Sequence, residues 1–195
     1  MNDEGDANSM WLLEPVRVAY EQAVAELRLI ARQGEYEASI VLDAATGQRL
    51  DSQLGDRHRV AYDPAKCAGR EAVVALHVHV DESPLSGDDW DVCLLNPEIR
   101  RIVAVTPTHA HILEKPNDWS PQAHKLPTRQ GDAHPTITPF ALFIAYAKNL
   151  KRRHGIADTV GWEDVPEETR NAIFVETNEF LESRFGVIVK KVKLP

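Results

Sequence analysis

The sequence predicts an α/β or α+β domain with a β-sheet at its centre. Two observations lead to this prediction. Segments whose apolar residues recur with helical period alternate with short β-branched segments along the 195-residue chain. Apolar residues make up 43% and charged residues 27% of the chain, which is ordinary for a protein with a buried core. We therefore expect one domain over residues 11–195, preceded by a polar, disordered N-terminus at 1–10.

The N-terminal part of this domain predicts a long helix and a pair of strands. An apolar stripe of helical period runs through 11–33 and ends at a Gln-Gly pair. The short apolar segment 37–43 is β-branched and predicts a strand. A turn containing Gly47 follows, so residues 48–50 can return as the partner strand.

The middle of the chain contains the most strongly predicted strand. Residues 51–70 are polar and favour no element, whereas 71–80 ("EAVVALHVHV") is apolar and β-branched throughout. A loop at 81–87 leads into a helix at 88–95, which stops near Asn96 before a proline.

The remainder of the chain predicts a further alternation of strands and helices. The expected elements are strands at 100–107 and 110–115, a long loop or linker at 116–138, helices near 139–154 and 166–184, and a closing strand at 187–194.

Charge, cysteine content and hydropathy argue against several classes of protein. Asp and Glu number 30 against 22 Lys and Arg, and the net charge of −8 disfavours nucleic acid as a partner outside a basic cluster at 148–153. Cys67 and Cys93 have no CxxC or zinc-finger spacing, so we expect a reducing cytoplasm. The start of the chain does not resemble a signal peptide. Because no apolar run approaches the ~20 residues of a membrane span, we expect no membrane contact.

The segment "LHVHVDESPLSGDDWDV" (76–92) carries side chains that ligate metals. In a strand, His77 and His79 point to the same side and are roughly 6.6 Å apart along the chain. Their imidazoles can converge on one ion, because Zn–N bonds are only ~2.0–2.1 Å long. Asp89, at the start of the next helix, can fold back as a third ligand. Two histidines and a carboxylate with one open position form a catalytic zinc arrangement, so the sequence predicts Zn²⁺ as cofactor.

Simpler interpretations exist for each part of this pattern. Ser86 is of the type that caps helices, and Asp88 and Asp89 favour the first helical turn through the helix dipole. Asp88 replaces Asp89 as the ligand if the helix begins one residue away. A second H-x-H pair, His109 and His111, has no carboxylate at a useful spacing, so we interpret it as strand surface or as residues on the substrate side.

The order H-x-H-x(6)-S-x-x-D within 77–89 resembles the signature of the JAB/MPN (JAMM) metalloprotease superfamily. The string "LSGDD" is similar to the L-S-G-x-D of its deubiquitinating members. The spacing is similar to that of bacterial and phage members, including RadC-like and toxin-associated domains. The resemblance extends from "EASIVLDAATG" at 37–47 to "VAVTPTHAHILEKPNDW" at 103–119.

This resemblance implies the JAB/MPN (cytidine-deaminase-like) fold, a central mixed sheet flanked by helices. The core then lies at 35–119, with a C-terminal extension of helices and a strand at 120–195. The implied activity is zinc-dependent hydrolysis of amide bonds by an isopeptidase or peptidase. The implied substrate is a protein or peptide, conjugates of a ubiquitin-like protein included. Members also form homodimers or bind partners in complexes.

The resemblance also implies roles for single residues. A glutamate on an early strand acts in this superfamily as general acid/base through the zinc-bound water. Glu37 matches it by position, and Glu35 is the rival on the same strand face. The superfamily serine, here Ser86, donates a hydrogen bond to the developing oxyanion, with helix capping as its alternative. His77, His79 and Asp89 are the implied zinc ligands.

The chain departs from the superfamily pattern at Val80, where a proline usually follows the second histidine. That proline is not a ligand, so the change bears on the adjacent loop and on substrate fit. A catalytically inactive scaffold or binding module is the alternative function, because many proteins of this fold have lost the metal. A DNA-associated role is disfavoured by the net charge. The H-x-E and P-C-x-x-C pattern of zinc deaminases and the Walker loop are both absent from the sequence.

Overall fold

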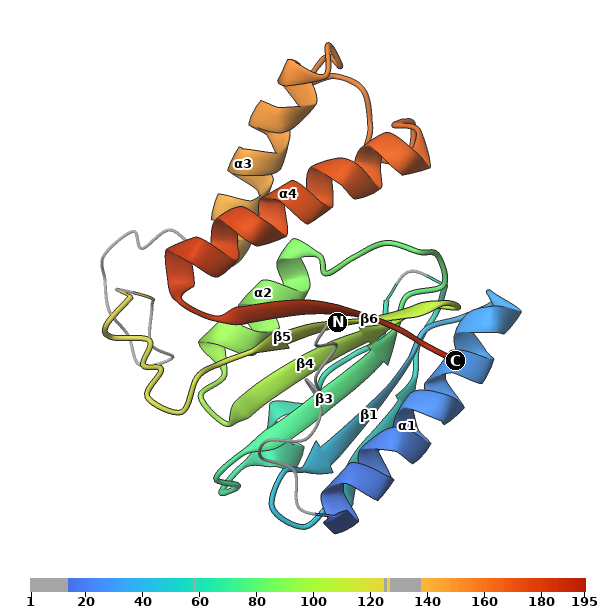
Figure 1. Cartoon of the computed structure of the whole chain (residues 1–195), viewed down its shortest axis with the longest axis vertical. Helices are drawn as coiled ribbons and strands as arrows, with labels where there is room; N and C mark the ends of the chain where they lie inside the picture. The colour runs from blue at the N-terminus through green and yellow to red at the C-terminus, as the bar shows by residue number, and fades with distance from the viewer. Residues whose placement is uncertain (1–13, 58, 125, 127–137) are drawn as a thin grey trace, which may run out of the picture.

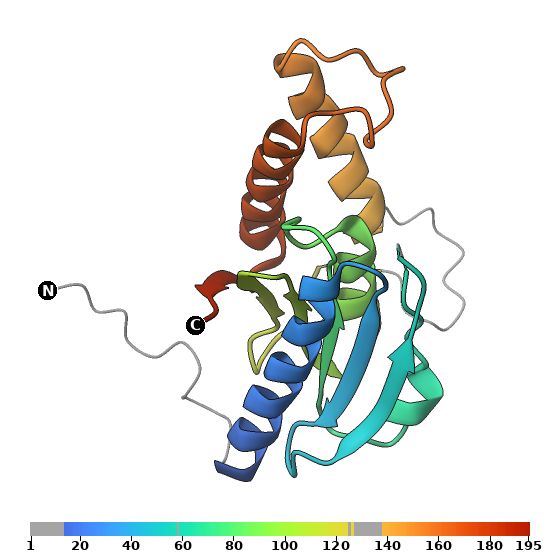
Figure 2. The ribbon, with the colours of Figure 1, turned by 90° about the vertical axis from the view of Figure 1, so that its right-hand side faces the viewer.

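The structure is a computed structural model that describes residues 14–57, 59–124, 126 and 138–195. It is a six-stranded mixed sheet with helices on both faces, which confirms the predicted α/β class (Figures 1 and 2). The disorder predicted at 1–10, the start of the predicted helix at 11–13 and the loop residues 127–137 lie outside the described residues.

The strands of the described residues form one sheet in the order β2-β1-β3-β4-β5-β6. Only β3 and β4 run parallel, because α2 carries the chain from the end of β3 back to the start of β4. The other neighbours are antiparallel. The strands are Ala38–Asp43 (β1), Arg49–Leu54 (β2), Val73–Val78 (β3), Ile99–Val105 (β4), His109–Glu114 (β5) and Ile188–Lys193 (β6).

Helices bury their apolar stripes against both faces of this sheet. On one face, α1 (Glu14–Gln33) buries Val16, Tyr20, Ala23, Leu27 and Ala31, which recur every three or four residues. On the opposite face lies α2 (Gly87–Leu95). Against α2 pack α3 (Pro139–Arg153) and α4 (Glu167–Phe185), a hairpin that projects beyond the sheet (Figures 1 and 2). Within the described part of the chain, no helix is long and apolar enough to cross a membrane.

The predicted and observed elements differ most within 51–70. β2 continues to Leu54, and a short 3-10 helix lies at Pro64–Cys67. β2 is an edge strand with the polar sequence "RLDSQL", so it lacks the β-branched run that marks a buried strand. The turn predicted at Gly47 is confirmed. Its φ is 75°, and a Cβ there would lie 2.9 Å from the Pro15 carbonyl oxygen of α1.

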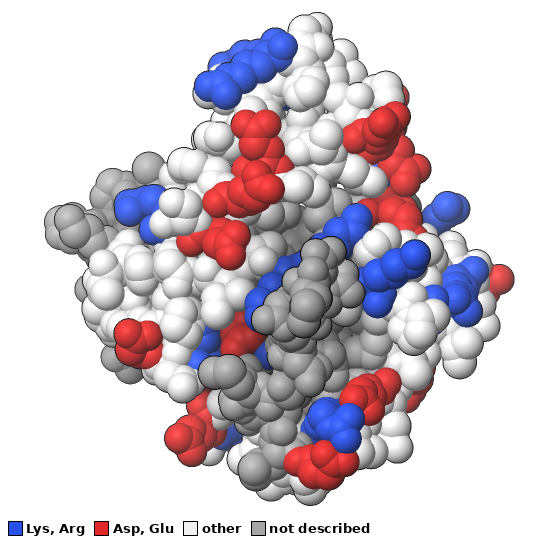
Figure 3. All heavy atoms as spheres, in the orientation of Figure 1, with Lys and Arg blue, Asp and Glu red and all other residues white. Residues whose placement is uncertain are grey.

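Charged side chains are unevenly placed on the hairpin. Acidic side chains follow α4 on the face seen in Figure 3, and basic ones lie over the far end of α3. The predicted basic cluster at 148–153 is partly engaged in structural contacts. Arg152 pairs with Asp158 at 2.6 Å, and the buried Lys151 ammonium donates to the Val160 carbonyl.

Candidate metal centre

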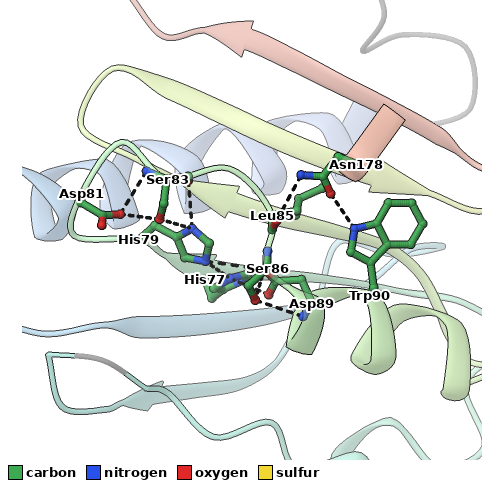
Figure 4. A network of polar contacts seen from close by, with 9 residues as sticks. All are labelled: His77, His79, Asp81, Ser83, Leu85, Ser86, Asp89, Trp90 and Asn178. Carbon is green, nitrogen blue, oxygen red and sulfur yellow. Dashed lines mark hydrogen bonds and ion pairs between the residues drawn. The ribbon is translucent and has the colours of Figure 1, made fainter. Parts of the chain in front are cut away.

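β3 and the residue after it bring His77 and His79 together. His77 pairs with Ser39 of β1. β3 ends at Val78, before the predicted limit, but the His79 backbone N–H still donates to the Val105 carbonyl at 3.0 Å. The chain therefore stays extended, and the two rings meet with their Nε2 atoms 3.0 Å apart (Figure 4).

The first turn of α2 presents Asp89. Ser86 is the N-cap, and its Ser-x-x-Asp pattern forms a capping box. The Ser86 backbone N–H and Oγ donate to Asp89 Oδ2 at 2.6 and 2.9 Å. Gly87 lets α3 pack closely here, because a Cβ would lie 2.8 Å from the Phe140 ring. The carboxylate is thereby held with Oδ1 directed at His77.

The three side chains bring one possible donor atom each within 4.8 Å of the others. Asp89 Oδ1 lies 3.0 Å from His77 Nε2, and Asp89 Oδ2 lies 3.6 Å from His79 Nε2. Two ligands that bind a tetrahedral ion at ~2.0–2.1 Å are about 3.3–3.4 Å apart. The three side chains are 9–12% exposed. A buried group of this size and chemistry can hold a metal ion.

A contact behind His79 orients its ring. His79 Nδ1 lies 3.0 Å from the Ser83 carbonyl oxygen, which can only accept a hydrogen bond. Nδ1 therefore carries the proton in the neutral ring, and Nε2 turns its lone pair towards His77 and Asp89. Metal-bound histidines are commonly held in this way by a carbonyl or carboxylate.

The ligands differ in their affinity for protons. Burial lowers the pKa of both histidines, but at His77 the Asp89 and Glu37 carboxylates outweigh burial and the pKa is raised. At His79 burial prevails, and the pKa is lowered. Burial opposes ionisation of Asp89, yet the two histidines and the Ser86 N–H lower its pKa far below the ordinary value.

Glu37 and the three candidate ligands line one cleft of about 690 Å³. Glu37 immediately precedes β1, and its backbone N–H donates to the Asp56 carbonyl at 2.7 Å. Burial raises the pKa of Glu37 to about 7, although the His77 charge opposes this. A carboxyl group with such a pKa can take up and release a proton near neutral pH. The rival Glu35 is exposed and does not line this cleft.

The structure separates the two aspartates that the sequence left as alternative ligands. Asp89 is buried among the histidines, whereas Asp88 is exposed on the edge of the cleft. Of the two roles predicted for Ser86, helix capping is confirmed. Its single hydroxyl proton is donated to Asp89, so a bond to an oxyanion would require that contact to break. The oxyanion role stays a prediction.

The second H-x-H pair lies elsewhere. His109 Nδ1 is 3.6 Å from Glu82 Oε2. His111 is 5% exposed, and its buried Nε2 has no hydrogen-bond partner among the described residues. Burial lowers the pKa of His111 to about 4, assisted by the Lys191 charge. Among the residues that the structure describes, only His77, His79 and Asp89 gather as a possible metal group.

Sequence reasoning missed the residues that support the ligands. Ser83 contacts His79, and Asn178 of α4 bonds to the loop and helix that carry Ser86 and Asp89. Ser83 stands in a polar loop, and Asn178 is 89 residues from Asp89, so neither carried a local signal.

Comparison with known proteins identifies no relative of this chain: no protein-family model, curated protein or solved structure matches it.

Proposed function

We propose that the protein is a zinc-dependent hydrolase of amide bonds with a JAB/MPN-type fold. The observation that carries this proposal is that three buried side chains each bring one donor atom within 4.8 Å of the others, in the cleft that also holds Glu37. Two neutral-nitrogen ligands and one carboxylate suit Zn²⁺, and three protein ligands leave a fourth position for water.

His77, His79 and Asp89 would hold the ion. When bound there, zinc lowers the pKa of a water molecule to about 7 and polarises a substrate carbonyl. Glu37 receives the proton of the attacking water on its carboxylate and passes it to the leaving amine. Ser86 keeps the Asp89 carboxylate turned towards the site through its N–H and hydroxyl. The ligands are 9–12% exposed, so bulk water reaches the donors only from the side of the cleft.

The cleft supports a protein or peptide substrate. Apolar residues from two neighbouring strands line it, among them Val41 and Ala75, as does the segment 59–62. A volume of about 690 Å³ accommodates several residues of an extended chain. The proposal includes both an isopeptide bond to a ubiquitin-like protein and a linear peptide bond.

Glu37→Gln tests the proposed activity. The variant should bind Zn²⁺ like the wild type but lose more than about 100-fold in hydrolysis rate, because proton transfer contributes 10²–10⁴-fold. Glu35→Gln is the matched control and should remain active. Zinc content is measured by elemental analysis. Hydrolysis is measured on conjugates of ubiquitin-like proteins and on a fluorogenic peptide library.

Retained hydrolysis in Glu37→Gln would reassign the base. A wild-type protein that holds no zinc after purification in its presence and hydrolyses no substrate would contradict the proposal. It would favour the binding-module alternative.

A further inference from the structure

Helix α4, outside the H-x-H-x(6)-S-x-x-D segment, contacts both halves of the candidate metal centre. The histidines come from β3 and the chain just after it, whereas Asp89 comes from α2. The loop between them, 79–86, sets their relative position. In Figure 4, the Asn178 side chain reaches this loop from α4.

Asn178 binds the two residues that flank the Ser86–Asp89 capping box. Its Nδ2 donates to the Leu85 carbonyl at 3.1 Å, and its Oδ1 accepts from Trp90 Nε1 at 2.6 Å. Nδ2 also donates to the Phe174 carbonyl within α4 at 2.8 Å. Asn178 is 3% exposed and Trp90 is fully buried. One side-chain amide therefore ties the loop before the cap to the helix after the ligand (Figure 4).

Arg170 of α4 reaches the histidine half through a chain of contacts that runs by way of Asp81 and Ser83. Its guanidinium lies 3.1 Å from Asp81 Oδ2. Asp81 Oδ1 accepts from the Ser83 backbone N–H at 3.0 Å and from the Ser83 hydroxyl. The Ser83 carbonyl accepts from His79 Nδ1 at 3.0 Å. The contact that orients His79 is thus linked to the same helix.

We propose that α4 is part of the metal centre and that Asn178 is a positioning residue for it. This inference rests on the metal site of the proposed function, but not on hydrolysis. Without the Asn178 amide, Leu85 and Trp90 are free to shift, and the Asp89 oxygens move relative to the histidine nitrogens. Loss of an outer partner of this kind typically weakens metal binding by 10–100-fold.

A purely structural role makes a different prediction. A buried polar residue can stabilise the fold without affecting the geometry of the ligands. Thr177, the neighbouring residue, provides the matched control, because it is fully buried and donates only within α4, to the Ile173 carbonyl at 2.7 Å. Thr177→Val and Asn178→Leu both remove a buried polar group from α4, but only Asn178→Leu releases the loop.

The experiment compares Zn²⁺ affinity with stability in the full chain. Zn²⁺ affinity is measured by competition with a chelator, stability by urea unfolding without metal, and ligand geometry by the visible spectrum of the Co²⁺-loaded protein. We expect Asn178→Leu to weaken Zn²⁺ binding by about 10–100-fold and to change the Co²⁺ spectrum. Thr177→Val should stay within about twofold of the wild type in Zn²⁺ affinity, whatever its stability.

A folded Asn178→Leu protein with wild-type Zn²⁺ affinity and Co²⁺ spectrum would overturn the inference. Should Asn178→Leu fail to fold, Arg170→Gln provides the test. We expect Arg170→Gln to weaken Zn²⁺ binding by less than about tenfold, and Arg170→Lys to restore the wild-type Zn²⁺ affinity. An Arg170→Gln affinity equal to that of the wild type would then overturn it. A wild-type protein that binds no Zn²⁺ would instead refute the metal site itself.

Discussion

The two H-x-H pairs of this protein have the same sequence pattern but different surroundings. His77 and His79 lie with ring centroids 4.8 Å apart and share Asp89. His109 and His111, on the same sheet, have centroids 6.4 Å apart, and His111 keeps an unpartnered, buried Nε2 within the described structure. The alternation of a strand brings two imidazoles to one side in both pairs. Within the described residues, one carboxylate contacts both rings in the first pair, and the capped turn of α2 delivers it.

The difference shows that the following loop and helix distinguish a candidate metal site from a buried histidine. The first pair is followed after six residues by a capping box, which holds Asp89 against both rings. Glu82 lies near the second pair, but it contacts only His109 and also accepts from Thr106 and Thr108.

The largest expected difference is in metal affinity between matched histidine variants. His79→Ala removes a ligand and should weaken Zn²⁺ binding by more than about 100-fold, beyond the loss typical of an outer partner. His111→Ala should leave the affinity within about twofold, because His111 is no part of the metal group. Chelator competition measures both variants. Equal losses would mean that the pairs act together.

Asp89 and Asp88 provide the same contrast for the carboxylates. Asp89→Asn keeps the shape of the side chain but removes its charge, and should also weaken Zn²⁺ binding by more than about 100-fold. Asp88→Asn should have no effect on binding, because Asp88 is exposed. Isothermal titration with Zn²⁺ measures both. A loss confined to Asp88→Asn would place the helix one residue away from its position here.

The metal-free protein should lose stability in acid because of His111. Its pKa falls from 6.5 to about 4 on folding, so the unfolded chain binds more protons between these values. Stability should therefore decline as the pH falls from 6.5 to 4, by roughly 3 kcal/mol in total from this group. His77 acts in the opposite sense, since its raised pKa gives stability that is lost as the pH rises.

Urea unfolding of the wild type and of His111→Phe at pH 7 and pH 4.5 isolates the His111 contribution. The variant should lack most of this decline. Identical pH dependence in the two proteins would contradict the assignment.

The smallest expected effect is on stability at neutral pH. His111→Phe removes the buried Nε2 that has no partner among the described residues, and should raise the free energy of unfolding by about 1 kcal/mol. Thermal unfolding of the metal-free protein at pH 7 measures this change. A strong destabilisation would show that the imidazole makes an essential contact.

Much of this fold follows from local patterns. Buried strands such as β3 and β4 were predicted from β-branched runs, and α1 from its apolar period. β2 was found only in part, because an edge strand alternates polar and apolar residues weakly. Its pairing with β1 depends on tertiary structure that no local window contains.

The residues of the candidate site were likewise predicted only in part from the sequence. His77, His79, Ser86 and Asp89 stand within thirteen residues, and this spacing together with the family resemblance predicted that they meet. Glu37 was chosen over Glu35 through a resemblance, and the structure places it in the cleft. Asn178 was not predicted, since its contact with Leu85 spans 93 residues and depends on how α4 packs.

The most direct test of the metal centre is a crystal structure of the zinc-loaded protein with anomalous data at the zinc edge. We expect one strong peak, ~2.0–2.2 Å from His77 Nε2, His79 Nε2 and an Asp89 oxygen. A peak at His109 and His111, or none with the three side chains pointing apart, would contradict it.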